Sequence, residues 1–179
     1  MKNQLLYLFC LFTFTIAQAQ LEKKYLNNDT YEYDELIEAY KLLGSQGSRG
    51  ELIEVGESDF GKPIYVFMIA PESFSTIRES KELREPSVLI NNAIHPGESC
   101  GVDASLHLAE DILSGKIESK VWVCIVPAYN VGGMHNRRSN TRANQQGPRS
   151  QGFRGNANNY DLNRDFTKAD TKNSESFYE

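Results

Sequence analysis

The sequence predicts an α/β fold in which a mixed β-sheet is flanked by helices. A strand-like run, a helical pattern and a second strand-like run follow one another between residues 87 and 127. This order forms a βαβ unit, whose two strands are parallel. Two earlier strand-like runs flank a short turn with glycine and proline, which predicts an antiparallel hairpin. The sheet is therefore expected to contain both parallel and antiparallel strand pairs.

Ahead of the sheet, residues 29–43 have the pattern of an amphipathic helix. Apolar side chains recur there at spacings of three and four, and a glycine follows the last of them. These residues are Leu36, Ile37, Tyr40, Leu43 and Gly44. The polar, Gly/Ser-rich residues 46–50 are expected to connect this helix to the first strand.

Four segments then have the composition of strands. The hairpin comprises residues 51–55 and 64–70, and a polar surface connection at residues 73–86 leads to a third strand at residues 87–93. The continuous apolar run at residues 121–127 predicts a fourth strand that is covered on both faces of the sheet. Between the last two strands, residues 100–114 form the predicted crossover helix, with Gly115 at its end.

The composition changes between residues 129 and 160, which are rich in Asn, Gly and Arg and poor in large apolar side chains. A loop of this length within a compact domain is either functional or disordered, and composition alone leaves both readings open. The arginines gather between residues 137 and 165, a stretch whose only acids are Asp161 and Asp165. The sequence therefore predicts a locally positive face, suited to an anionic group.

Overall composition excludes several classes of protein. With 24% charged and 40% apolar residues, the 179-residue chain has an ordinary globular composition rather than that of a disordered protein. Its net charge of -5 argues against nucleic-acid binding. Lys2, an apolar run and Ala17-Gln18-Ala19 have the order of a secretory signal peptide at residues 1–19. We therefore expect an exported protein, secreted or periplasmic, with no membrane anchor after cleavage.

Export permits a disulfide between the two cysteines that would remain, Cys100 and Cys124. The sequence neither requires nor excludes this bond, and two free thiols are an equally good reading.

The strongest local signal for chemistry is His95-Pro96-Gly97-Glu98, at the end of the third predicted strand. Imidazole nitrogen and carboxylate oxygen are good zinc ligands, and a separation of three residues allows one turn to direct both at one ion. Ligands of open α/β sheets also bind at the carboxyl ends of strands. The alternative is a loop histidine, with Glu98 favouring the start of the next helix.

Two further signals lie downstream. Asn163-Arg164 offers a planar guanidinium and a neutral amide donor, a combination that can bind a carboxylate. Arg142 lies within the arginine-rich stretch, in Asn140-Thr141-Arg142. Each of these is also typical of a solvated surface, and an arginine-rich tract could alternatively stack on RNA bases.

Together the three signals resemble the zinc carboxypeptidase family of the carboxypeptidase A type. The resemblance covers residues 52–166 and includes the contexts at residues 144–148, 152–157 and 161–166, which are similar to one bacterial branch. It implies that His95 and Glu98 bind Zn²⁺. It also implies that Arg142 faces the scissile carbonyl, with Arg138 close enough to compete for that role, and that Asn163 and Arg164 bind the terminal carboxylate of a peptide or protein substrate.

The resemblance also implies a third zinc ligand, a histidine, and a general-base glutamate, both well beyond Asn163-Arg164. His107, His135, Glu175 and Glu179 lie in the wrong places to replace them. We therefore expect a fold that is incomplete on its C-terminal side, from a fragment or a truncated gene. Three units result: the signal peptide, a helical lead-in and linker at residues 20–50, and the amino-terminal part of a catalytic domain at residues 51–179.

The leading hypothesis is a monomeric, zinc-dependent exopeptidase that removes residues from a free C-terminus. A small-molecule amidohydrolase acting on N-acyl amino acids uses similar motifs, although export argues against it. A protein that has lost catalysis but still binds carboxylates is the alternative from another class.

Overall fold

The computed structural model describes residues 21–73, 86–143 and 145–178. Its sheet has the order β1-β2-β4-β3, formed by Gly50–Glu57, Pro63–Ile69, Trp122–Val126 and Ser87–Asn91 respectively. Strand β2 is antiparallel to both β1 and β4, whereas β3 and β4 are parallel. The predicted mixed sheet, with its hairpin and its βαβ unit, is confirmed.

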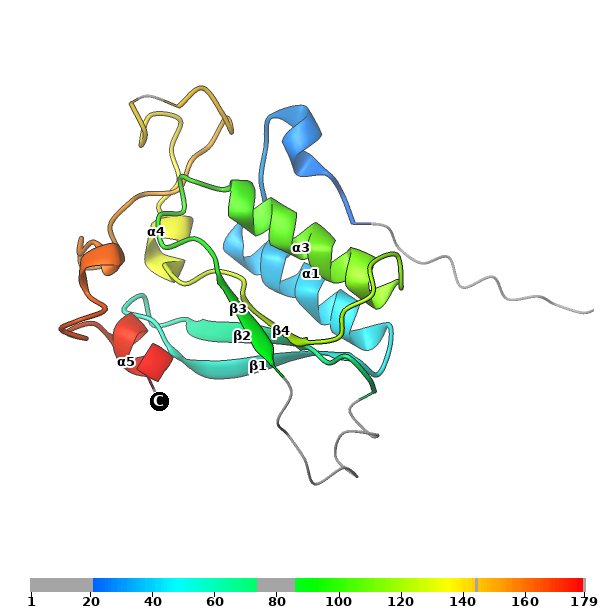
Figure 1. The fold of residues 1–179 in the computed structure, drawn as a ribbon. Coiled ribbons are helices and arrows are strands. Elements are labelled where there is room, and N and C mark those ends of the chain that lie inside the picture. Colours follow the sequence, from blue (N-terminus) through cyan, green and yellow to red (C-terminus); the bar gives the residue numbers. More distant parts are fainter. Residues whose placement is uncertain (1–20, 74–85, 144, 179) are drawn as a thin grey trace, which may run out of the picture.

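Two long helices, α1 (Tyr33–Ser45) and α3 (Cys100–Leu113), lie side by side on one face of the sheet (Figure 1). Four short helical segments complete the described chain. They are η1 (Lys24–Asn27), α4 (Val131–His135), η2 (Leu162–Arg164) and α5 (Lys172–Tyr178). Within the described residues, no helix is long and apolar enough to cross a membrane.

The core lies between the two long helices and the sheet. Tyr40 of α1 packs on Phe67 of β2 with 5.0 Å between the ring centroids, and both side chains are fully buried. Leu36, Leu106 and Ile125 are also inaccessible to solvent. Burial of each such side chain contributes about 1.5–3 kcal/mol, so this layer holds the sheet and thereby the loops that follow its strands.

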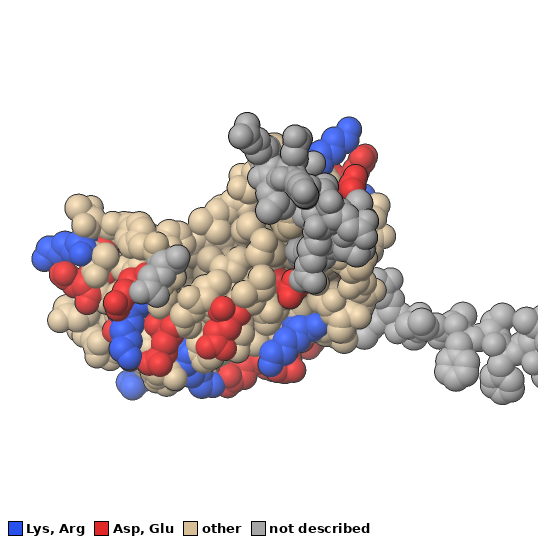
Figure 2. Space-filling model, turned by 90° about the horizontal axis from the view of Figure 1, so that it is seen from below, with Lys and Arg blue, Asp and Glu red and all other residues tan. Residues whose placement is uncertain are grey.

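The opposite face of the sheet is less covered by described residues. Viewed from below, charged side chains gather along one margin of the molecule and uncharged residues fill much of the remaining surface (Figure 2). In β3, the edge strand, Val88 and Leu89 are 48% and 54% exposed. Because neighbouring residues of a strand point to opposite faces, both faces of this edge carry accessible apolar surface.

The predicted elements differ from the observed ones mainly at their ends. Helix α1 begins at Tyr33 rather than residue 29, because the Glu35 carboxylate accepts a hydrogen bond from the Glu32 amide (3.1 Å) just before the helix. Part of the supposed loop at residues 129–160 is the short helix α4. The predicted signal peptide and most of the connection at residues 73–86 lie outside the described residues. Cys100 and Cys124 are free thiols.

Asp165, immediately after η2, fixes the turn that leads to α5. It is 7% exposed and accepts hydrogen bonds from the Thr171 hydroxyl (2.7 Å) and from the backbone amides of Asp170 and Thr171. Burial alone would raise the pKa of the Asp165 carboxyl. The hydrogen bonds from the Ser174 and Thr171 hydroxyls and the two amides outweigh burial and hold this pKa at about 2.

We therefore expect Asp165→Asn to lower the free energy of unfolding by about 2 kcal/mol at neutral pH. A depressed carboxyl pKa stabilises the folded state above about pH 4, and this contribution is lost as the pH falls toward 2. The difference between variant and wild type should accordingly shrink over that range in urea unfolding experiments. Glu175→Gln, at an exposed position of α5, should leave the loss of unfolding free energy between pH 4 and pH 2 unchanged. If Asp165→Asn loses as much unfolding free energy over this pH range as the wild type, the role given to Asp165 is wrong.

Candidate active site

The His95–Glu98 segment forms a tight turn at the carboxyl end of β3. The backbone amide of Asn92 donates to the carbonyl of Val126 in β4 (3.1 Å), so the chain leaves the sheet in a fixed place. The Glu98 amide then donates to the His95 carbonyl (2.8 Å) and closes the turn. As a result, His95 Nδ1 and Glu98 Oε1 are 3.4 Å apart. His95 is 8% exposed, whereas Glu98 remains accessible to solvent.

The other nitrogen of the His95 ring is held by Asp161, which precedes η2. His95 Nε2 and Asp161 Oδ1 are 2.8 Å apart, and Oδ1 also accepts the Asn163 amide (3.0 Å). Asp161 Oδ2 accepts two hydrogen bonds from the Arg154 guanidinium, at 3.1 and 2.9 Å. A carboxylate on one ring nitrogen orients the imidazole. The other ring nitrogen, Nδ1, faces Glu98 and also lies 3.4 Å from Arg154 Nη1.

The low pKa of the Asp161 carboxyl means that this partner of His95 is charged at neutral pH. Burial alone would raise the pKa of this carboxyl. The hydrogen bonds from His95, Arg154 and the Asn163 amide, together with the charge of Arg154, outweigh burial and hold it at about 2. At neutral pH Asp161 is therefore an acceptor, and His95 Nε2 carries the proton of their hydrogen bond.

Arg142 reaches the same turn from the long loop. Its Nη2 atom lies 2.6 Å from Glu98 Oε1. The approach depends on Gly97, where a Cβ atom would lie 2.8 Å from Arg142 Cγ and 2.9 Å from the Gly152 carbonyl oxygen. Glycine at this position therefore lets the loop pack directly on the His95–Glu98 turn.

Asn163 completes one wall of the site. It lines a cavity of about 310 Å³ together with His95 and Glu98. Arg164, the next residue of η2, is exposed, and its Nη1 donates to the Asn163 carbonyl (2.9 Å). The structure thus places His95, Glu98 and Asn163 around one space and Arg142 against Glu98. Arg164 lies on the adjoining turn and contacts Asn163 through that hydrogen bond.

The long loop is ordered by polar contacts rather than by an apolar core. The buried side chain of Asn130, at the start of α4, accepts from the Gly133 amide (2.8 Å) and donates to the carbonyls of Ile94 and Arg154 (3.2 and 3.0 Å). An isolated antiparallel bridge between Arg138 and Gln151 pairs the two sides of the loop. The side-chain amide of Asn130 therefore joins Ile94, next to the His95–Glu98 turn, to the loop.

The expectation of a locally positive face is wrong in its simple form. Arg137 is directed inward, with 7% of its side chain exposed, and donates to the carbonyls of Tyr31 and Ser150. Arg142, Arg149 and Arg154 pair with carboxylates, which are Glu98, Asp29 and Asp161. Two of these acids come from distant parts of the sequence, so local composition could not reveal them.

The donor set fits part of a zinc site. His95 and Glu98 supply a nitrogen and an oxygen on one turn, and Asp161 fixes the imidazole. Among the described residues, however, no group of three His, Cys, Asp or Glu side chains could hold a metal ion. His107 instead pairs with Glu110 on α3, and His135 stacks on Phe60. The described residues thus offer two donors of the kind that zinc binds, and a closed site requires more.

This geometry agrees with a comparison of the sequence against protein families, in which the model described as zinc carboxypeptidase matches residues 38–178. The chain belongs to the zinc carboxypeptidase family. The matched region includes His95, Glu98, Arg142, Asn163 and Arg164. No curated protein matches the sequence.

Solved carboxypeptidases share the fold. A metallo-carboxypeptidase from Burkholderia cenocepacia is 17% identical with a TM-score of 0.60, over 83% of this chain and 37% of its own. Carboxypeptidase A from Helicoverpa armigera is 14% identical with a TM-score of 0.55, over 84% of this chain and 42% of its own. The present chain therefore spans about two fifths of the length of these carboxypeptidases.

Asp161 and Arg154 are site residues that the sequence did not predict. Asp161 stands two residues before Asn163, and this spacing was available as a signal. Its partner His95 lies 66 residues earlier, however, and only the folded chain brings the two side chains together.

Proposed function

We propose that the protein is a zinc-dependent exopeptidase that hydrolyses the C-terminal peptide bond of peptides or proteins. One observation carries the proposal: His95 and Glu98, which have the chemistry of zinc ligands, line the same cavity as Asn163, which can bind a carboxylate. A cavity that combines zinc ligands with a side chain able to bind a carboxylate suits cleavage next to a free C-terminus.

In this proposal His95, through Nδ1, and Glu98 hold the zinc. When bound, zinc polarises the substrate carbonyl and lowers the pKa of a coordinated water. Asp161 keeps the His95 ring in the required orientation and tautomer. Arg142 stabilises the negative charge that develops on the carbonyl oxygen, an effect that typically contributes about 10²–10³ in rate. Asn163 and Arg164 bind the terminal carboxylate and exclude internal peptide bonds.

We place the third zinc ligand and the general base in a part of the domain that this sequence does not include. The coverage of about two fifths of the similar solved chains supports this proposal. The exposed apolar residues Val88 and Leu89 on edge strand β3 support it too, because a further strand would cover them. We also propose that residues 1–19 are a signal peptide through which the protein is exported, and that the protein is a monomer.

The test compares peptides with a free C-terminus and the same peptides with a C-terminal amide, using the full-length gene product. We expect cleavage of the free acids only. Arg164→Ala should lower kcat/KM for them by about 10- to 100-fold, as expected for loss of a charged hydrogen bond. Lys168→Ala, which removes an exposed cation four residues away, is the matched control and should change little. Equal cleavage of acids and amides would contradict the proposal.

A further inference from the structure

The guanidinium of Arg154 reaches both nitrogens of the His95 ring. Its Nε and Nη2 atoms donate to Asp161 Oδ2, at 3.1 and 2.9 Å, and Asp161 Oδ1 lies 2.8 Å from His95 Nε2. The remaining atom, Nη1, lies 3.4 Å from His95 Nδ1. One side chain therefore acts on Nε2 through Asp161 and on Nδ1 directly.

The backbone places Arg154 beside His95 independently of these side-chain contacts. The side-chain amide of the fully buried Asn130 donates to the carbonyl of Arg154 (3.0 Å) and to that of Ile94 (3.2 Å), the residue before His95. The amide of the neighbouring Phe153 donates to a carbonyl of α4 (2.8 Å). Because these bonds involve only main-chain atoms of residues 153 and 154, a substitution of the Arg154 side chain leaves them in place.

The chemistry of the contacts selects one tautomer of the His95 ring. A guanidinium has five N–H donors and no acceptor, so the ring nitrogen that faces it presents a lone pair. A carboxylate only accepts, so the ring nitrogen that faces Asp161 carries the hydrogen. Nδ1 thus keeps its lone pair and Nε2 keeps its proton, which is the form in which Nδ1 can bind a metal ion.

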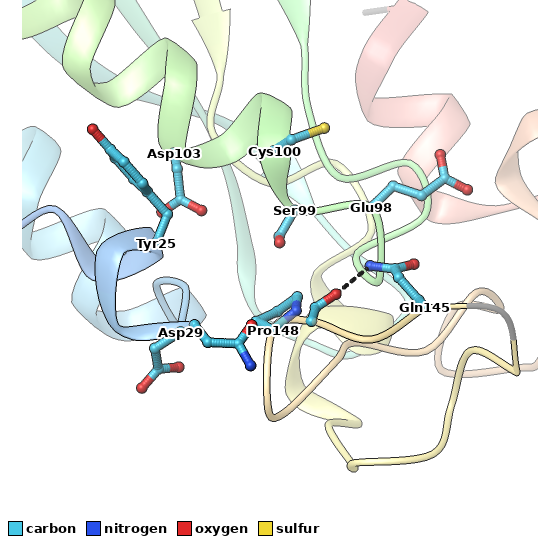
Figure 3. A pocket seen from close by; sticks show the side chains of 10 residues that line it. Tyr25, Asp29, Glu98, Ser99, Cys100, Asp103, Gln145 and Pro148 are labelled. Carbon is cyan, nitrogen blue, oxygen red and sulfur yellow. Dashed lines mark hydrogen bonds between the residues drawn. The ribbon is translucent and has the colours of Figure 1, made fainter.

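Glu98 is the other neighbour of His95 Nδ1. Its Oε1 atom lies 3.4 Å from Nδ1, the same distance as Arg154 Nη1. In Figure 3, which shows the pocket beside this turn, the Glu98 side chain extends away from Asp103. Of the three contacts that Arg154 makes here, the one to Nδ1 is the longest. A metal ion at Nδ1 therefore competes with the weakest of them, while the two bonds to Asp161 remain.

We propose that Arg154 is a positioning residue of the candidate active site, which holds Asp161 in place and thereby fixes the orientation and tautomer of His95. The proposal deepens the proposed function and rests on it for the assignment of His95 as a zinc ligand. The fork of Nε and Nη2 closes on one oxygen of Asp161 and leaves the other oxygen for His95. A lysine, with a single charged nitrogen, cannot reproduce this fork.

The first measurement is the zinc affinity of the full-length gene product, from competition with a chelator. We expect Arg154→Met to weaken zinc binding by about tenfold, a usual effect of losing a group that supports a metal ligand. The sign of the change separates positioning from charge, because removal of a nearby positive charge by itself favours a metal cation. Arg154→Lys, which keeps the charge but not the fork, should still weaken binding by at least about threefold.

Arg149→Met is the matched control, because it makes the same substitution in the same loop. Arg149 pairs with Asp29 at 3.5 Å, and 69% of its side chain is exposed. Its loss should leave zinc affinity within about twofold of the wild type. A double-mutant cycle then tests whether Arg154 acts through Asp161. In the Asp161→Asn background, Arg154→Met should weaken zinc binding by no more than about twofold further.

A second measurement, ¹⁵N NMR of the histidine rings after removal of metal, does not involve zinc. In alkaline buffer, where free imidazole is neutral, His95 of the wild type should show an unprotonated Nδ1 and a protonated Nε2. Arg154→Met should give a mixture of the two tautomers. The ring signals of His107, which pairs with Glu110, should not change.

Unchanged or tighter zinc binding in Arg154→Met, wild-type affinity in Arg154→Lys, additive effects in the cycle, or an unchanged His95 spectrum would each overturn the proposal. Failure of the proposed function gives a different result. In that case zinc affinity does not depend on His95, or amidated peptides are cleaved as well as free acids. The tautomer of His95 still reports on Arg154 alone.

Discussion

His95→Ala is expected to weaken zinc binding by the full-length gene product more than about 100-fold. The substitution removes the ring nitrogen that faces Glu98 and also leaves Asp161 without the group it orients. Loss of an orienting partner alone typically costs 10- to 100-fold in metal affinity, so loss of the ligand itself costs more. The measurement is a zinc affinity from competition with a chelator, which does not depend on catalysis.

His107→Ala is the matched control for this experiment. His107 lies on α3 and pairs with Glu110 rather than with the His95–Glu98 turn. Its removal should leave zinc affinity within about twofold of the wild type. Unchanged affinity in His95→Ala, or a large loss in His107→Ala, would show that the metal binds elsewhere.

The second large effect concerns folding. Phe67→Ala should lower the free energy of unfolding by about 3–5 kcal/mol, the usual cost of removing a buried aromatic side chain. Phe67 is fully buried in β2 and packs on Tyr40, and a Cβ atom on Gly50 would lie 2.9 Å from its ring. The surroundings are therefore closely packed and cannot easily fill the cavity that the substitution leaves. Urea unfolding followed by circular dichroism measures the change.

Phe60→Ala removes the same side chain from a different environment. Phe60 is 45% exposed and stacks on His135, so its loss should cost about 1 kcal/mol or less. Similar costs for the two substitutions would contradict the location of the core between the helices and the sheet.

Most of the sheet and both long helices follow from the sequence because their apolar patterns are periodic. The short segments do not. Helix α4 contains Gly132 and Gly133, which intrinsic propensity disfavours, and it forms because Asn130 caps it and the neighbouring loop packs against it. Helix α5 has seven residues and depends on the turn held by Asp165. Such tertiary contacts leave no periodic signal.

The candidate site divides in the same way. The spacing of His95 and Glu98 indicates two ligands on one turn, because that relation is local in the chain. The pairing of His95 with Asp161 and of Glu98 with Arg142 joins residues 66 and 44 positions apart. The arginine-rich composition suggested free positive charge, and the fold neutralises much of it with distant carboxylates.

The most direct test of the account is ¹⁵N NMR of the histidine rings during titration of the full-length protein with zinc. The structure predicts that His95 alone among His95, His107 and His135 responds, through Nδ1 on the side of Glu98. Nε2 should keep its proton because Asp161 holds it. Addition of N-acetyl-phenylalanine should then shift the side-chain amide of Asn163. Coordination through Nε2, a response from His107 or His135, or an unchanged Asn163 signal would contradict the account.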